Sequence, residues 1–168
     1  MLLTGTAGTA TASGGIVYGP EWREIVNAET GLCVGIRQED GADAPGARVQ
    51  QGDCTGVDEQ HWLPTPVPGT SNIVTFTEGR NHLCLDVHLA SEDRPTLLQQ
   101  WPCNGTVAQQ WEIRSTGEIV AQMNSECLDT VSTKRGTVVT PSPCGGVLEQ
   151  RWVLRGEVLT LGGSKIFE

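Results

Sequence analysis

The cysteines are the residues of this chain whose type and spacing suggest chemistry most directly. There are six, in three pairs: Cys33 and Cys54 lie 21 positions apart, Cys84 and Cys103 lie 19 apart, and Cys127 and Cys144 lie 17 apart. None belongs to a Cys-x-x-Cys motif, the spacing typical of zinc sites and thioredoxin-type redox centres. The pairs therefore indicate structural disulfides and no metal site.

A Gln-x-Trp motif follows each cysteine pair at a constant distance. Eight positions after the second cysteine stands Trp62, Trp111 or Trp152, each preceded two positions earlier by a glutamine. Three copies in register form a threefold internal repeat. Six cysteines allow fifteen connectivities, and the repeat selects the three bonds inside the repeats. Each would close a loop of about 20 residues and contribute roughly 3 kcal/mol in the chain-entropy model. Disulfides of this kind form outside the cytosol, so we expect a secreted protein.

The other residues that could support catalysis form no recognisable site. The only histidines are His61, His82 and His88, and none lies in a nucleophile or metal motif. His61 is the variable residue of the first Gln-x-Trp and is expected at the surface. Asp86 and His88 lie two apart and would share a strand face. We predict no enzymatic activity, no metal and no cofactor.

Composition excludes two kinds of partner. The net charge is −9, whereas nucleic-acid binding depends on Lys and Arg that neutralise phosphates. The same charge disfavours anionic lipid surfaces. No run approaches the ~20 apolar residues of a membrane span.

The elements that would position these residues are short strands. Alternating segments open the repeats near 21–27, 72–76 and 117–121, and no segment has helical periodicity over the ~10 residues a helix needs. We therefore predict an all-β domain at 20–168, with repeats at about 21–71, 72–116 and 117–163. The proline-rich segment 64–69 is expected as a connector, and 157–161 as the strand that closes the structure against the first repeat. Residues 1–19 are rich in Thr, Ala and Gly and are expected as a flexible linker or the remnant of an export signal.

Three repeats of about four strands, each too small for its own core, must share one. Trp62, Trp111 and Trp152 are the expected occupants. The glutamine of each motif is expected to bind backbone.

The chain resembles the ricin B-chain type lectins, which include the family 13 carbohydrate-binding modules. The resemblance rests on the Cys-Leu-Asp-Val start at Cys84, the Gln-x-Trp-Pro-Cys segment ending at Cys103 and the three Gln-x-Trp motifs, and it covers about 21–163. It implies a β-trefoil: a six-stranded barrel capped by three hairpins, each repeat stapled by one disulfide. It also implies up to one shallow sugar pocket per repeat.

The family pattern favours the second repeat as a sugar site. An Asp after the first cysteine, a Gln and an aromatic residue before the second cysteine, and an Asn-Gln pair complete the family's pocket. Asp86, Gln99, Trp101 and Gln109 match, with Ala108 at the Asn position. The carboxylate would accept hydroxyl hydrogen bonds, the amides would orient the sugar and the ring would stack on it.

The other two repeats match the pattern poorly. The third keeps Asp129 and Gln150 as weaker candidates, with Thr140, Ser142 and Glu149 at the other positions. The first keeps Gln50 and Gln60, with Gly35, Gly52 and Glu59 at the others.

Two functions follow from this pattern. One is a secreted carbohydrate-binding domain for galactose-type or xylose-type glycans. The alternative is a trefoil that has lost most sugar sites and serves as a protein-interaction subunit of a secreted toxin or enzyme assembly. In that case we expect a broad exposed apolar or loop surface at 38–48 and 64–68.

Overall fold

The computed structural model describes residues 21–88, 96–159 and 165–167, so the predicted tail at 1–19 lies outside the described residues. The described residues contain thirteen strands and four single 3-10 turns. The strands are β1 (Arg23–Asn27), β2 (Cys33–Ile36), β3 (Val49–Gly52), β4 (His61–Pro66), β5 (Ile73–Glu78), β6 (Cys84–Val87), β7 (Leu98–Trp101), β8 (Trp111–Ile113), β9 (Ile119–Ala121), β10 (Cys127–Thr130), β11 (Val139–Ser142), β12 (Trp152–Leu159) and β13 (Lys165–Phe167). The turns are η1 (Gln38–Asp40), η2 (Asp58–Gln60), η3 (Val107–Gln109) and η4 (Leu148–Gln150).

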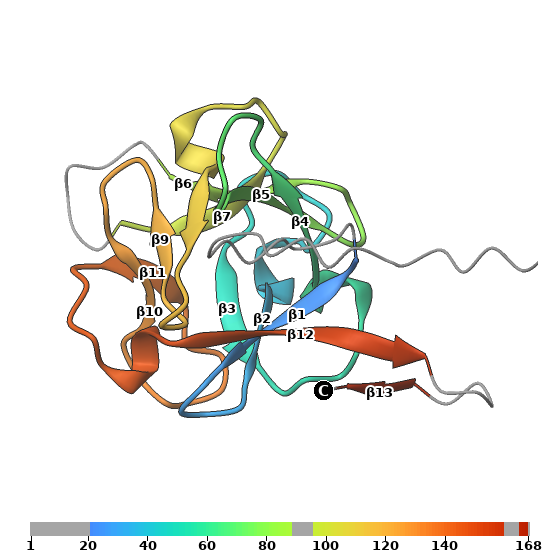
Figure 1. Ribbon diagram of the computed structural model, residues 1–168. Helices are drawn as coiled ribbons and strands as arrows, with labels where there is room; N and C mark the ends of the chain where they lie inside the picture. The colour runs from blue at the N-terminus through green and yellow to red at the C-terminus, as the bar shows by residue number, and fades with distance from the viewer. Residues whose placement is uncertain (1–20, 89–95, 160–164, 168) are drawn as a thin grey trace, which may run out of the picture.

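Six strands form a barrel in which the first and third repeats meet. Antiparallel pairing runs in the order β9-β8-β5-β4-β1-β12, and β1 lies along β12 from Arg23 opposite Gly156 to Asn27 opposite Trp152 (Figure 1). The Trp152 N–H also donates to the Gly117 carbonyl at 2.8 Å, just before β9. The hairpins β2–β3, β6–β7 and β10–β11 are the remaining strands of the three repeats. The all-β trefoil is therefore confirmed.

The three predicted disulfides are present. Cys33–Cys54, Cys84–Cys103 and Cys127–Cys144 each join the start of one hairpin strand to the segment after its partner strand, with Cα–Cα distances of 5.1, 5.1 and 5.0 Å. All three distances lie in the normal range for a disulfide.

The three motif tryptophans occupy the shared core, as predicted. Trp62 and Trp111 are fully buried and Trp152 is 4% exposed. A buried indole needs a hydrogen-bond acceptor for its N–H. The three Nε1 atoms donate to the carbonyls of Val34, Leu85 and Leu128 at 3.0, 3.1 and 2.9 Å, so each tryptophan anchors the first hairpin strand of its own repeat.

Two strand assignments from the sequence are wrong in extent. β4 continues through Pro64 to Pro66, paired with β5. Pro64 and Pro66 are two positions apart, so the N–H groups that they lack would both point to the same edge of β4. On the side of β4 that faces β1, the strand pairing extends only as far as Trp62. The closing strand is also displaced: β1 pairs with 152–156, whereas 157–159 pairs with β13.

The expected surface position of His61 is wrong as well. Its side chain is only 7% exposed, because the turn after β5 covers it. The Gly79 N–H donates to the His61 carbonyl at 2.9 Å, and a Cβ on Gly79 would lie 3.3 Å from that of His61.

Candidate functional site

In the second repeat the structure brings Asp86 together with two of its predicted partners. Asp86 on β6 is paired with Gln99 on β7. Gln99 Nε2 donates to Oδ1 at 2.9 Å, and Gln109 Nε2 donates to Oδ2 at 3.0 Å. Asp86 is 4% exposed, and each carboxylate oxygen has two acceptor positions. The carboxylate is therefore held in one orientation with an acceptor position left on each oxygen.

Gln109 supports this arrangement from below the surface. It ends the turn η3, is fully buried, and has both amide atoms occupied. Its Oε1 accepts the Asn104 N–H at 2.9 Å, and its Nε2 also donates to the Pro102 carbonyl at 3.0 Å. Gln109 therefore positions Asp86 and the loop after Cys103, and its amide is not presented to solvent.

Trp101 is the apolar part of the set. It is the last residue of β7 and is 41% exposed. Among the described residues it is the only aromatic in the set of exposed large hydrophobic side chains. Trp101 is paired with Cys84, two positions along the hairpin from the Asp86–Gln99 pair, so the exposed ring and the oriented carboxylate belong to one short stretch of it. Ala108 at the Asn position is buried.

The third repeat keeps the same scaffold without the ring. Gln150 Nε2 donates to Asp129 Oδ2 and to the Pro143 carbonyl, both at 2.9 Å. Thr140 is paired with Asp129 in the position of Gln99, and Ser142 stands where the second repeat has its exposed tryptophan. The weaker candidates Asp129 and Gln150 therefore meet, but one amide and the stacking surface are missing.

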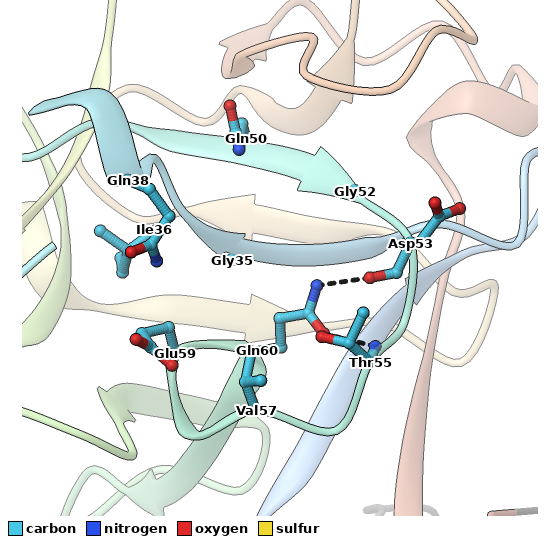
Figure 2. Close-up of a pocket in the computed structure, with 10 residues that line it drawn as sticks. All are labelled: Gly35, Ile36, Gln38, Gln50, Gly52, Asp53, Thr55, Val57, Glu59 and Gln60. Carbon is cyan, nitrogen blue, oxygen red and sulfur yellow. Dashed lines mark hydrogen bonds between the residues drawn. The ribbon is translucent and has the colours of Figure 1, made fainter.

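The first repeat is hollow at the corresponding place. A cavity of about 400 Å³ is lined by the ten residues labelled in Figure 2. Gln60 again holds the loop, because its Oε1 accepts the Thr55 N–H at 2.9 Å and its Nε2 donates to the Asp53 carbonyl at 2.7 Å (Figure 2). Gly35 supplies no carboxylate, and a Cβ there would lie 2.9 Å from Gln60 Cγ.

Two acidic residues line that cavity, Asp53 and Glu59, and both form ion pairs within the protein; Asp53 pairs with Arg135. Glu59 is 8% exposed and pairs with the Arg80 guanidinium, which also contacts Asp43 at 2.8 Å. Burial penalises the charged form of Glu59, but a backbone N–H, the Arg80 guanidinium and the Gln38 side chain outweigh it and lower the pKa of Glu59. The negative charge is therefore neutralised within the protein.

One arrangement beside the second-repeat site escaped the sequence analysis. Arg48, just before β3, forms a two-bond ion pair with Asp40 at the end of η1, with Nε–Oδ2 and Nη2–Oδ1 distances of 2.8 and 2.9 Å. The guanidinium lowers the pKa of Asp40 to about 2. No sequence motif predicts this pair, because Asp40 and Arg48 are eight positions apart and meet only through the path of the loop between them.

Comparison with protein families agrees with this architecture. The family model described as the ricin-type beta-trefoil lectin domain matches residues 21–152. This chain belongs to that family. No curated protein sequence matches the chain.

Solved structures share the trefoil of this lectin domain. A designed threefold symmetric protein, ThreeFoil, has a TM-score of 0.72 at 24% identity, with 79% of this chain and 96% of that chain covered. The exo-beta-1,3-galactanase 1,3Gal43A from Clostridium thermocellum has a TM-score of 0.72 at 22% identity, covering 83% of this chain and 31% of the enzyme. The C-half of the earthworm R-type lectin, in complex with GalNAc, has a TM-score of 0.63 at 16% identity, covering 82% and 100%. At these identities the likeness establishes the fold.

No helix among the described residues is long and apolar enough to cross a membrane.

Proposed function

We propose that this lectin domain is a secreted, non-catalytic carbohydrate-binding domain with one working sugar site, in the second repeat. The observation that carries the proposal is the combination of an oriented carboxylate, Asp86, and an exposed ring, Trp101, on adjacent strands of one hairpin. Galactose-type and xylose-type glycans are the proposed ligands. The three disulfides support an extracellular location.

Each side chain has a distinct role in the proposed site. Asp86 accepts hydrogen bonds from two neighbouring sugar hydroxyls, and Trp101 stacks on the apolar face of the ring. Gln99 holds Oδ1 of Asp86 and presents its own Oε1 to a further hydroxyl. Gln109 acts through Asp86 alone. A net hydrogen bond contributes about 1 kcal/mol, somewhat more with a charged group, so a single small site binds weakly and depends on multivalency or a fused partner for avidity.

The alternative, a protein-interaction subunit, predicted a broad exposed apolar or loop surface at 38–48 and 64–68. The loop over 38–46 is largely exposed, but its exposed residues are not large hydrophobic ones. The exposed large hydrophobic side chains of the described residues lie elsewhere and are spread over the three repeats; they are Val57, Trp101, Val107, Met123, Val131, Val147, Leu148 and Val153. Scattered apolar residues of this kind need no partner to explain them. This distribution counts against an apolar docking surface among the described residues, and the support for the sugar site comes from Asp86 and Trp101.

A glycan array probed with the oxidised protein tests the proposal. The Asp86→Ala, Trp101→Ala double variant removes the carboxylate and the ring, and the Asp129→Ala, Ser142→Ala variant makes matched changes in the third repeat. We expect binding by the wild type and the third-repeat variant, and its loss in the second-repeat variant. If the folded wild-type protein bound no glycan on the array, the sugar site would be rejected and a protein partner favoured.

A further inference from the structure

A groove of about 460 Å³ lies between the first and second repeats, next to the proposed sugar site. This volume falls in the range of roughly 300–1,000 Å³ typical of small-molecule sites. Two repeats contribute to its lining, which consists of Asp40, Gly46, Arg48, His88, Leu97, Leu98, Gln99 and Trp101.

The two walls of the groove are fixed to each other by the fold. Gln100 on β7 is fully buried, and its Nε2 donates to the carbonyls of Ala42 and Ala44 at 2.7 and 2.9 Å. The backbone adds two bonds, from Gly46 N–H to the Gln100 carbonyl at 2.8 Å and from Gln100 N–H to the Ala47 carbonyl at 3.0 Å. The groove is therefore preformed, which lowers the ordering cost of binding.

Gln99 and Trp101 belong both to this groove and to the proposed sugar site. Gln99 is 8% exposed and its Nε2 is bound to Asp86, whereas its Oε1 accepts no hydrogen bond within the part of the chain that the structure describes. A methyl group placed on Gly46 would lie 3.9 Å from this Oε1 and 4.0 Å from Cζ3 of Trp101. The groove therefore adjoins the proposed Asp86 site and shares Gln99 and Trp101 with it.

The far wall carries donors and acceptors but no net charge. An arginine has five N–H donors in a planar fork, and the pair with Asp40 uses one from Nε and one from Nη2. The Arg48 side chain is 40% exposed and the Asp40 side chain 18%. The ion pair has no net charge to attract a charged ligand. It offers N–H donors on Arg48 and carboxylate acceptors on Asp40, which match sugar hydroxyl groups because a hydroxyl both donates and accepts hydrogen bonds.

We propose that this groove is a second subsite, in which the Arg48–Asp40 pair binds the next unit of a neutral glycan chain whose first unit occupies the Asp86 site. The inference rests on the proposed function, since the first unit must bind beside Trp101. With this subsite the ligand would be an oligosaccharide, and the first repeat, through Arg48 and Asp40, would distinguish longer glycans from single sugars. The connection through Gln99 and Trp101 gives the glycan a continuous surface across two repeats.

Calorimetric titration with xylose and xylotriose, and with galactose and β-1,3-galactotriose, tests the subsite. We expect the wild type to bind one trisaccharide about five- to tenfold more tightly than its monosaccharide, the gain from one added polar contact. Arg48→Met keeps the aliphatic stem and should abolish this gain while changing monosaccharide affinity less than about twofold. Arg48→Lys keeps the positive charge but lacks the planar guanidinium, so it should retain only part of the gain in trisaccharide affinity. It also provides a second variant if Arg48→Met fails to fold.

Arg37→Met is the control, because Arg37 is an arginine of the same segment that forms an ion pair with the more exposed Glu39 and does not line the groove. It should leave the chain-length ratio unchanged. Equal affinity of the wild type for monosaccharide and trisaccharide would overturn the subsite and leave the Asp86 site standing. An Arg48→Met variant that weakens both ligands equally would do the same. Binding of neither sugar series would overturn the proposed function together with the subsite.

Discussion

The buried glutamine of the second Gln-x-Trp motif should make a large contribution to stability. Gln109→Ala deletes three hydrogen bonds, to the Asn104 N–H, the Pro102 carbonyl and the Asp86 carboxylate. With about 1 kcal/mol for each neutral bond and about 2 kcal/mol for the bond to the carboxylate, the free energy of unfolding should fall by about 4 kcal/mol. Denaturant titration of the oxidised protein, followed by tryptophan fluorescence, measures this change.

Two matched variants make the test specific. Gln60→Ala in the first repeat loses three neutral bonds, from the Thr55 N–H, from the Thr55 hydroxyl and to the Asp53 carbonyl, and none to a carboxylate because Gly35 stands in that place. A fall of about 3 kcal/mol is therefore expected. Gln110→Ala removes one exposed 3.4 Å bond and should change stability by less than about 0.5 kcal/mol. The reasoning is refuted if Gln109→Ala destabilises no more than Gln60→Ala does.

Three further changes test other parts of the structure. Arg48 lowers the pKa of Asp40 from 3.8 to about 2, so this pair stabilises the fold above pH 4 and its contribution disappears as the pH falls from 4 to 2. Asp40→Asn should therefore flatten the plot of melting temperature against pH between pH 4 and 2. A slope equal to that of the wild type would count against the pair. Burial raises the pKa of Glu78 above 4.5 against the opposing backbone N–H bonds, so its contribution is complete below pH 4.5 and declines as pH rises through the raised pKa. Urea unfolding of Glu78→Gln from pH 4 to 7 should lack this decline, and a slope equal to that of the wild type would contradict it. Replacing Cys127 and Cys144 by serine opens a loop with a sequence separation of 17 and should lower the unfolding free energy by about 3 kcal/mol, whereas a midpoint within error of the wild type would show that the bond adds nothing.

The resemblance to the ricin-type lectins predicted the trefoil, and the repeat pattern was sufficient to predict the three disulfides and the buried tryptophans. These features depend on residue types that recur in register, and three copies of the same spacing leave few other arrangements. The extent of β4 and of β12 could not be predicted in this way. Pro64 has no backbone N–H, so a strand tolerates it only where the neighbouring strand needs no donor at that position. The arrangement of the barrel determines which neighbour that is.

Residue roles were harder to predict than residue positions. The sequence predicts that the amide of Gln109 binds backbone, and the structure confirms this. Only the structure shows that the same amide also holds Asp86 instead of facing a ligand. His61 is buried because a turn of the next repeat covers it, a contact between segments that no local pattern records. The Arg48–Asp40 pair likewise depends on the path of a loop.

The central claim is that Trp101 forms part of a sugar site, and the indole N–H signals of the nitrogen-15 spectrum test it most directly. The chain has five tryptophans, and the indoles of Trp62, Trp111 and Trp152 are bonded to core carbonyls. During titration with xylotriose or β-1,3-galactotriose, the Trp101 signal should shift and saturate while these three stay in place. A Trp101 signal that remains unmoved at millimolar concentrations of both sugars would contradict the claim.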